Sequence, residues 1–483
     1  MNKLSKLFIF TFVFLANIIF AKDIYNFQSN DQELTILEHS ISALYKRIIL
    51  IRNAKSSIDL EYFIFNRDLS GKIILKELVK KAEEGVKVRI LVDHFMTKKE
   101  FSKKFIYVLN KHNISVKVYN PAPITKFNKV QYRNHRKLFI IDREHLITGG
   151  RNIGDDYFDL STHYNFYDRE IYLQGNIVSS ISDSFDDFWN SKNSKFSNLK
   201  GPREKVYTKS YKRGKSYQRE LRLWDKKLLK YYNFLNKDND KYLTTLHQVM
   251  VNGPRELKHE VTGTCHDILF VSDRPYVTKK ERKKFKRLKD FILQKLKSTK
   301  NRLIIDSPYF IINKHVKKIL KDIRVKKDLK FDIYTNGLYS TDAFYANSVL
   351  NTVIKKYLSN NVFKFHFFDG FNVKDYNYLD NSYKKTRKGT HSKTYIFDNK
   401  FFIGTYNFDP RSNIYNSELG IQCNNSTMLT QTLISSIKKR YLTAHIVEKK
   451  KDLKKVKFKN VSFFKVLTYY LGNLPSLLFI HLL

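Results

Sequence analysis

Cysteine is scarce in this sequence of 483 residues, which contains only Cys265 and Cys423. Neither stands in a C-x-x-C motif or in a cluster of histidines and cysteines, which argues against a zinc site and against a thiol redox centre. The two can form one disulfide if the protein is exported, since disulfides persist in oxidising compartments. Two unpaired thiols in a core are the alternative, and the sequence leaves both open.

Acidic side chains are also few. The 46 Asp and Glu residues face 89 Lys and Arg residues, a formal net charge of +43. No carboxylate-rich constellation stands out that would hold a divalent cation, so we expect neither a metal nor another cofactor. A positive field attracts polyanions, but it does not distinguish among nucleic acid, anionic lipid surfaces and phosphorylated substrates. The hydrophobic content of 42% is ample for packed cores and argues against global disorder.

Long uninterrupted apolar runs are missing as well. Two lysines precede an almost wholly apolar run at residues 7–20, which is short for a bilayer span. This pattern is typical of a secretory signal peptide, here residues 1–21. Bulky Ile19 fits a cleavage site poorly, so an uncleaved N-terminal membrane anchor is the alternative. No cysteine follows the run, which argues against a lipoprotein signal.

The C-terminal tail, residues 446–483, carries a second membrane signal. A polybasic stretch at 448–460 precedes an apolar stretch that Gly472 and Pro475 interrupt. The interruption argues against a straight spanning helix and favours a segment lying on an anionic membrane surface. A C-terminal helix packed on the core is the alternative.

The rest of the chain contains two series of segments in the same order. Strands are expected at 56–65, 86–93 and 114–121, and again at 301–311, 329–336 and 362–369. Helical stretches alternate with them, which indicates a largely parallel sheet covered by helices. Two series in one order predict two copies of one α/β unit, an N-terminal lobe at 22–198 and a C-terminal lobe at 286–445. Between them, residues 199–285 are predicted to be a basic linker with helical insertions, which is a candidate flap over the cleft. A basic amphipathic helix is expected at 279–301.

The same short pattern closes each series. "HRKLFIID" (135–142) and "HSKTYIFD" (391–398) both read His-x-Lys, four residues, Asp, and a Gly-containing turn with an Asn follows each. In a strand the His and Lys of each motif project from one face of the sheet. A pseudo-twofold axis between the lobes would bring both pairs to one cleft.

Two imidazoles and two ammonium groups facing one space suit a phosphodiester rather than a cation. The lysines would neutralise the non-bridging oxygens, and Asn152 and Asn407 can donate hydrogen bonds to them. One imidazole would attack phosphorus while the other protonates the leaving alkoxide. A covalent phosphohistidine then divides one difficult displacement into two easier ones.

The two motifs resemble the HxK(x)4D signatures of the phospholipase D superfamily. The flanking segments "GGRNIGDDYF", "YNFDPRSNIYNSELG" and "YFIFNRDLSG" are similar to those of bacterial cardiolipin synthases of the class C type. The resemblance spans most of residues 32–198 and 300–445. It implies an α/β fold of two pseudo-twofold-related phospholipase D-like lobes, with mixed, largely parallel sheets flanked by helices and a shared active-site cleft.

The resemblance also assigns the site residues. The catalytic set comprises the motif residues His135, Lys137, Asp142, His391, Lys393 and Asp398; phosphate binding is assigned to Gly150, Asn152, Thr405 and Asn407; and the carboxylates that orient the histidines are Asp168 and Glu418. The resemblance favours His135 as the nucleophile and His391 as the general acid. Asp142 and Asp398 end the motif strands, and we expect them to support the fold more than the chemistry.

Two departures from the family pattern concern the turns after the motifs. Gly150 stands where the family commonly has Ser. Six residues lead from Asp398 to Gly404, against seven from Asp142 to Gly149, a deletion that could shift Thr405 and its neighbours.

The leading functional hypothesis is phosphatidyl transfer to phosphatidylglycerol, which makes cardiolipin. A phospholipase D that releases phosphatidic acid and a metal-independent exported nuclease are the alternatives, and an exported binding protein without activity would leave the duplicated motif unexplained. The expected partners are phospholipid substrates, namely phosphatidylglycerol with phosphatidylethanolamine as a second candidate, and an anionic membrane surface; nucleic acid is expected only for a nuclease. A monomer is expected because one chain carries both motifs. The protein is expected to be exported or membrane-associated, at the periplasmic face of a bacterial inner membrane.

Overall fold

The computed structural model describes residues 26–123, 125–208, 212–312, 314–325, 328–355, 357–358, 362–370 and 386–455, with a few single positions between 461 and 471. The expected signal peptide or anchor at residues 1–21 and most of the tail lie outside the described residues. Within the described part of the chain, no helix combines the length and the apolar character that a membrane span requires.

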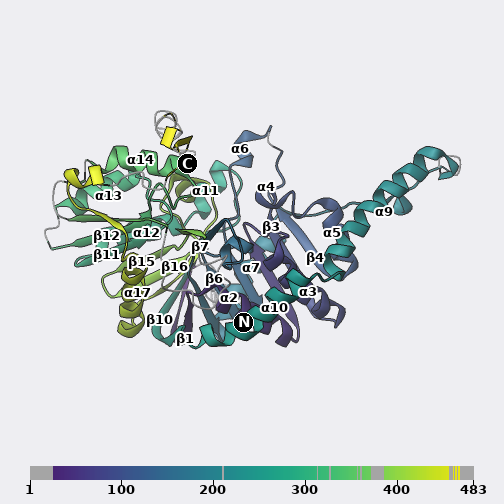
Figure 1. Ribbon diagram of the computed structural model, residues 1–483, viewed down its shortest axis with the longest axis horizontal. Helices are drawn as coiled ribbons and strands as arrows, with labels where there is room; N and C mark the ends of the chain where they lie inside the picture. The colour runs from purple at the N-terminus through teal and green to yellow at the C-terminus, as the bar shows by residue number, and fades with distance from the viewer. Residues whose placement is uncertain are drawn as a thin grey trace, which may run out of the picture.

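One mixed sheet of sixteen strands runs through the described part of the molecule (Figure 1). The strands of this sheet are β1 (Asn26–Leu37), β2 (Ser57–Tyr62), β3 (Lys87–Asp93), β4 (Ile114–Tyr119), β5 (Leu138–Ile141), β6 (His145–Gly149), β8 (Glu170–Gln174), β9 (Ser194–Phe196), β10 (Val261–Ser272), β11 (Arg302–Asp306), β12 (Lys330–Asn336), β13 (Phe363–Phe368), β15 (Thr394–Phe397), β16 (Lys400–Gly404), β17 (Leu419–Cys423) and β18 (His445–Val447). A separate two-stranded sheet pairs β7 (Tyr164–Tyr167) with β14 (Arg387–Thr390).

The strand order shows that the chain is built from two related halves. Outward from the centre, one half runs β1-β8-β6-β5-β2-β3-β4-β9 and the other runs β10-β17-β16-β15-β11-β12-β13-β18. Strands β1 and β10 pair antiparallel at the centre and join the halves into one sheet. The expected mixed α/β architecture of two pseudo-twofold-related lobes is therefore confirmed.

Parallel pairing is less extensive than the sequence suggested. Within the large sheet, it joins β2 to β3 and β3 to β4 in one half, and β11 to β12 and β12 to β13 in the other. The motif strands β5 and β15 instead enter hairpins with β6 and β16 and run antiparallel to their neighbours. A tight turn after the motif aspartate allows only antiparallel pairing, because a parallel partner needs a long crossover.

Helices bury both faces of the sheet. They are α2 (Ser40–Asn53), α3 (Leu69–Glu83), α4 (His94–Thr97), α5 (Lys103–Lys111), α6 (Phe127–Val130), α7 (Asn176–Asn190), α9 (Lys215–Asn236), α10 (Asp240–Leu257), α11 (Lys279–Phe285), α12 (Leu288–Ser298), α13 (Lys314–Arg324), α14 (Phe344–Ile354), α16 (Pro410–Ile414) and α17 (Thr427–Arg440). In β5, Phe139 and Ile141 pack in the cluster under α2, α3 and α5, whereas Leu138 and Ile140 pack in the cluster that α7 and α17 cover. Successive strand residues face opposite sides, so a strand that is buried on both faces is apolar throughout.

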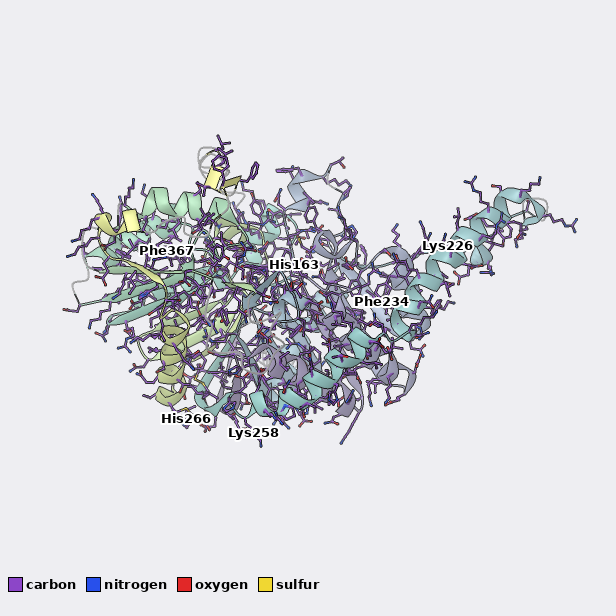
Figure 2. All side chains as sticks on the ribbon, viewed as in Figure 1. His163, Lys226, Phe234, Lys258, His266 and Phe367 are labelled. Carbon is purple, nitrogen blue, oxygen red and sulfur yellow. A yellow bond between two sulfur atoms is a disulfide. The ribbon has the colours of Figure 1, made fainter. Side chains whose placement is uncertain are left out.

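Residues 199–285, expected to be a linker with helical insertions, contain α9 and α10 and also a strand that the sequence analysis missed. That strand, β10, takes in the second half the central place that β1 takes in the first. Helix α9 extends away from the body of the molecule, and Lys226 lies on its projecting part (Figures 1 and 2). The flap suggested for residues 199–285 stays a prediction.

The basic helix expected at 279–301 is divided into α11 and α12. At the break, the Lys286 side chain turns inward and donates to Asp273 Oδ2 and to the Asn416 carbonyl, both at 2.8 Å. The other carboxylate oxygen of Asp273 accepts the backbone N–H groups of Arg287 and Leu288. One buried carboxylate thus ends the first helix and caps the second.

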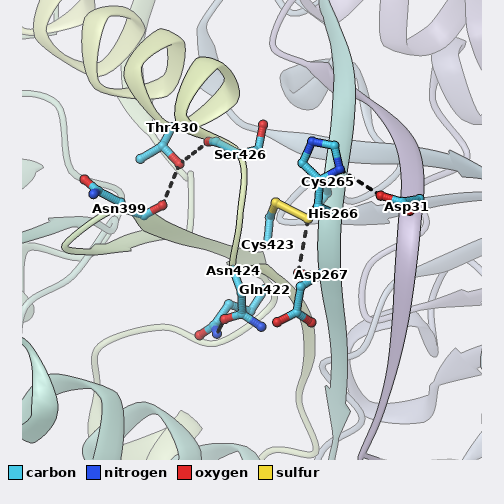
Figure 3. Close-up of a disulfide and its surroundings, with 10 residues drawn as sticks. All are labelled: Asp31, Cys265, His266, Asp267, Asn399, Gln422, Cys423, Asn424, Ser426 and Thr430. Carbon is cyan, nitrogen blue, oxygen red and sulfur yellow. Dashed lines mark hydrogen bonds and ion pairs between the residues drawn. A yellow bond between two sulfur atoms is a disulfide. The ribbon is translucent and has the colours of Figure 1, made fainter.

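Cys265 and Cys423 form a disulfide between β10 and β17, with their Cα atoms 5.8 Å apart (Figure 3). Of the two alternatives that the sequence left open, the structure shows the cross-link. It joins the strand at the centre of the sheet to the strand that follows Glu418, 158 residues away along the chain.

Candidate active site

Each His-x-Lys triplet lies immediately before its strand rather than within it. Strand β5 begins at Leu138 and β15 at Thr394, so the strand expected at 135–142 begins three residues later than predicted. The alternation of side chains nevertheless persists through the triplet. Arg136 lies on the opposite side from its neighbours, with Nε 3.2 Å from Glu61 Oε1.

The two histidines bind carboxylates in a crossed arrangement. His135 Nδ1 lies 2.8 Å from Glu418 Oε2, and His391 Nδ1 lies 2.6 Å from Asp168 Oδ2. Each carboxylate therefore belongs to the lobe that does not supply the histidine. A carboxylate accepts the Nδ1 proton, so the lone pair of each neutral ring lies on Nε2, where it is available for chemistry.

Backbone hydrogen bonds explain the crossing. The His135 N–H donates to the Ser417 carbonyl at 3.0 Å, and the His391 N–H donates to the Tyr167 carbonyl at 2.6 Å. Ser417 and Tyr167 immediately precede the two carboxylate residues. Each histidine is thus placed beside its partner by main-chain contacts across the junction of the lobes.

Both lysines bend back onto their own motifs. Lys137 Nζ donates to the His135 carbonyl at 2.8 Å, and Lys393 Nζ donates to the His391 carbonyl and lies 2.8 Å from His391 Nδ1. Burial, together with the charge of Lys393, lowers the pKa of Lys137 to about 7. Burial likewise lowers the pKa of Lys393 to about 8. The charge of Lys393 thus reaches the ammonium group of the other motif.

The imidazoles are neutral at pH 7. Burial lowers the pKa of His135 to about 4 and that of His391 to about 3, and the nearby lysines act in the same direction against the pull of the carboxylates. Lys393 acts on His135 and Lys137 acts on His391, which again places both pairs around one centre. A bound anionic phosphodiester would raise these pKa values by offsetting the lysine charges.

The carboxylate of Glu418 is held by hydroxyl groups. Thr405 Oγ1 donates to Oε2 at 2.5 Å, and Ser412 Oγ donates to Oε1 at 2.7 Å. Burial alone would raise the pKa of Glu418, but His135 and the nearby lysines hold it below its ordinary value. Thr405, expected at the substrate phosphate, is therefore engaged with the carboxylate that orients His135.

The carboxylate of Asp168 is held by backbone instead. Its Oδ1 accepts the Arg169 N–H at 2.8 Å, and a Cβ atom at Gly150 would lie 2.1 Å from the same oxygen. Glycine at this position thus makes room for the carboxylate, which gives the departure from the family's Ser a steric reason. The pKa of Asp168 is also below its ordinary value, because His391 and Lys393 outweigh the effect of burial.

The two asparagines lie at equivalent buried positions. Asn152 Oδ1 accepts the Ile64 N–H at 3.2 Å, and its Nδ2 makes no hydrogen bond of normal geometry, although the Tyr157 hydroxyl interacts with the side chain. In the described part of the chain Asn407 Oδ1 has no hydrogen-bond partner. Since the two ends of an amide can exchange places, both side chains retain capacity for a ligand.

The motif aspartates lie outside the site. Asp142 accepts the backbone N–H groups of residues 55–57, which precede β2, at 2.7 to 2.9 Å. Asp398 does the same for residues 300–302, which precede β11, at 2.7 to 3.1 Å. Both anchor a chain segment that enters a parallel strand, which agrees with the supporting part expected for them.

Aromatic rings surround the histidines. Phe63 lies edge-on to His135 with ring centroids 4.7 Å apart, and Tyr157 and Phe166 lie 5.2 and 5.0 Å from the His391 ring. The sequence analysis did not single out these residues, nor Ser412. Phe63 lies in the segment "YFIF" beside β2, Tyr157 in "GGRNIGDDYF" and Ser412 in the turn after Asn407. Nothing in the sequence connects these residues to the histidines, because their contacts depend on how the two lobes meet.

Comparison with known proteins identifies the family and agrees with the fold. Residues 48–189 and 292–440 match the family model described as cardiolipin synthase, PLD-like domain. An uncharacterized protein of Helicobacter pylori is 30% identical over 427 residues, which cover 84% of this chain and 79% of that protein. Cardiolipin synthase C of Escherichia coli is 27% identical over 426 residues, covering 84% and 83% respectively.

Among solved structures, the phosphatidylserine synthase of Haemophilus influenzae superposes with a TM-score of 0.61 over 93% of this chain and 95% of that one. The sequence identity of 13% makes this a likeness of fold.

Proposed function

Because the chain belongs to the cardiolipin synthase family of phospholipase D-like proteins, we propose that it transfers a phosphatidyl group from one phospholipid to the glycerol hydroxyl of phosphatidylglycerol. The observation that carries the proposal is the crossed pair of histidine–carboxylate contacts with both lysines in the same buried space. Such a centre offers two neutral imidazoles and two cations to one phosphodiester. Asn152 and Asn407 would complete the contacts to its oxygens.

In the first step, His135 Nε2 attacks phosphorus and the bond from phosphorus to the headgroup oxygen breaks. That oxygen takes the proton that His391 Nε2 acquires when the bound anionic phosphodiester raises the pKa of the ring, and it leaves as the free alcohol. In the second step, the acceptor hydroxyl gives its proton to His391 Nε2 while its oxygen bonds to phosphorus and the N–P bond of phosphohistidine breaks. Both histidines then return to their initial states.

Two related functions compete with this proposal. Water in place of the acceptor gives a phospholipase D, and the same centre could act on the diesters of nucleic acid. The family match favours lipid, whereas the net charge of +43 is equally compatible with nucleic acid. We assign the protein to an exported or membrane-associated setting, because its N-terminal 21 residues read as a signal or anchor and because its disulfide suits an oxidising compartment.

The test is to incubate the purified protein, without added metal, with phosphatidylglycerol vesicles and separately with plasmid DNA. Cardiolipin and glycerol should form in equal amounts. If phosphatidic acid is the main product, the protein is a phospholipase D and not a transferase. Cleaved DNA without lipid turnover would overturn the proposal.

Variants at the two histidines test the mechanism. His135→Ala should lower kcat by about 10⁶-fold, the scale seen when a catalytic nucleophile is removed. Labelled lipid should leave an acid-labile phosphoryl group on residue 135 of the wild-type protein. Label recovered on His391 instead would exchange the two assignments.

A further inference from the structure

A cavity of about 640 Å³ lies between α6, α11 and the residues that follow α16, outside the histidine centre. Ligand pockets for small molecules range from about 300 to 1,000 Å³. The space is therefore large enough for the headgroup and glycerol of a phospholipid.

The charge of the cavity is of one sign. Lys129, Lys279 and Arg282 line it, and no aspartate or glutamate is among the described lining residues. The acidic residue of α11, Glu281, is engaged elsewhere, since it accepts the Val277 N–H and pairs with Lys192 at 2.9 Å. No carboxylate in the described part of the chain forms an ion pair with the three cations, which suits them to an anionic ligand.

The rest of the lining is apolar and aromatic. Phe127 is 56% exposed at the rim, and the rings of Tyr132 and Tyr415 meet edge-on with centroids 5.6 Å apart. Ile414 and Val277 complete this side. Cations beside an apolar wall match a phosphodiester that carries a glycerol ester.

The main chain connects this cavity to the catalytic centre. The segments 132–135 and 415–418 run side by side, with the Ser417 N–H donating to the Arg133 carbonyl at 2.9 Å and the His135 N–H donating to the Ser417 carbonyl. Tyr132 and Tyr415 stand at one end of this pairing and the His135–Glu418 contact at the other. Three extended residues span on the order of 10 Å.

The equivalent place in the other half of the site is filled. There β7 and β14 form a parallel ladder, and Lys388, at the position that corresponds to Tyr132, is buried and pairs with Asp159 at 3.0 Å. Asn165, which corresponds to Tyr415, is buried and donates to the Ser161 carbonyl. Among the described residues, unpaired cations and open space thus lie on the His135 side.

We propose that this cavity binds the acceptor phospholipid through its phosphodiester, with Lys129, Lys279 and Arg282 on the phosphate and the tyrosine rings against its glycerol. The inference rests on the proposed transfer reaction. It explains how an acceptor that already carries a negative charge can approach a centre that holds a phosphorylated histidine.

The experiment replaces all three cations, Lys129→Gln, Lys279→Gln and Arg282→Gln, and compares two acceptors for the same donor. Phosphatidylglycerol is the charged acceptor, and ethanol, which gives phosphatidylethanol, is the neutral one. Cardiolipin formation should fall at least roughly tenfold, the effect of losing about 1.4 kcal/mol of acceptor binding. Phosphatidylethanol formation should stay unchanged, because the first step and the histidines are intact.

The matched control removes the same charge from helix α9 through Arg219→Gln, Arg222→Gln and Lys226→Gln, and it should leave both products unchanged. An equal loss of both products in the cavity variant, or no loss of cardiolipin, overturns the inference. Wild-type protein that makes neither product refutes the proposed function instead. In that case, the inference is tested by calorimetry, with dihexanoyl phosphatidylglycerol titrated into the His135→Ala protein. Two equivalents of lipid should bind, and only one should bind when the three cavity substitutions are added. An unchanged number of equivalents would exclude the site.

Discussion

His135 and His391 occupy equivalent positions in the two lobes, but the carboxylates that meet them differ by one methylene group. Glu418 reaches its histidine with a longer side chain, and two hydroxyl groups fix its free rotations. Asp168 has fewer rotations to fix and is placed by its own backbone against Gly150.

The difference teaches how one half of a duplicated site can change while the chemistry is kept. A shorter carboxylate must approach closely, so the residue that faces it loses its side chain. A longer carboxylate leaves room for Thr405 and gains a donor from it. The site therefore contains two matched pairs, Gly150 with Asp168 and Thr405 with Glu418. Replacing one member of a pair without the other should lower the rate.

Removing the charge of either carboxylate should have the largest effect. Asp168→Asn and Glu418→Gln each remove the acceptor that fixes the histidine tautomer, and kcat should fall by about 10³- to 10⁴-fold in each variant, as for comparable histidine–aspartate pairs. Steady-state kinetics with phosphatidylglycerol measures both. A small loss in one variant only would show that the two halves are not equivalent in the chemistry.

Exchanging the facing residues should distinguish the two solutions. Gly150→Thr would displace the Asp168 carboxylate, and a misplacement of about 1 Å costs about 10²-fold in rate. Thr405→Val removes one of two hydroxyl donors to Glu418 and should cost only about tenfold. The reverse order of effects, in variants whose thermal unfolding is unchanged, would contradict the steric account.

The two lysines should lose their protons at different pH values, and the pH dependence of kcat/KM should therefore distinguish the two halves of the site. Both must be protonated to hold an anionic phosphate, so kcat/KM should decline as the pH rises above about 7, where Lys137 loses its proton, and further above about 8, where Lys393 does. Lys137→Arg keeps its charge at these pH values and should leave only the decline near pH 8. A pH profile of kcat/KM for both proteins provides the measurement, and an unshifted alkaline limb would assign it to another group.

Substitution of the motif aspartates should have the smallest effect on catalysis. It should lower the free energy of unfolding by a similar amount in both lobes. Asp142→Ala and Asp398→Ala each leave three backbone N–H groups without their cap, which costs about 1–2 kcal/mol of unfolding free energy, with kcat unchanged. The pKa of Asp142 is lowered in the folded state because backbone donors hold its charged form against the effect of burial. Its contribution is therefore present above the unfolded pKa and is lost as the pH falls through the lowered folded value.

Denaturant unfolding of both variants at pH 7 and pH 3 checks this equivalence. A loss of kcat larger than about tenfold in either variant, with the fold intact, would return that aspartate to the catalytic set.

The sequence predicted the repeated units and both His-Lys pairs, because strand periodicity and motif spacing are local properties. It missed β10, since "VTGTCHDILFVS" mixes glycine and polar residues into a strand whose outer part is solvent-facing. It did not predict which carboxylate meets which histidine, because that depends on how the lobes join through β1 and β10. Gly150 was assigned to phosphate for the same reason: only the position of Asp168 reveals why a side chain is excluded there.

Because each histidine binds a carboxylate of the other lobe, neither half of the site is complete while the protein is being synthesised and folded. A nascent or half-folded polypeptide that has only its first lobe contains a histidine with no carboxylate to set its proton, and a carboxylate with no histidine. The proposed mechanism therefore predicts that such an intermediate is inactive toward phosphodiesters, and that activity requires the last third of the chain, which supplies both His391 and Glu418.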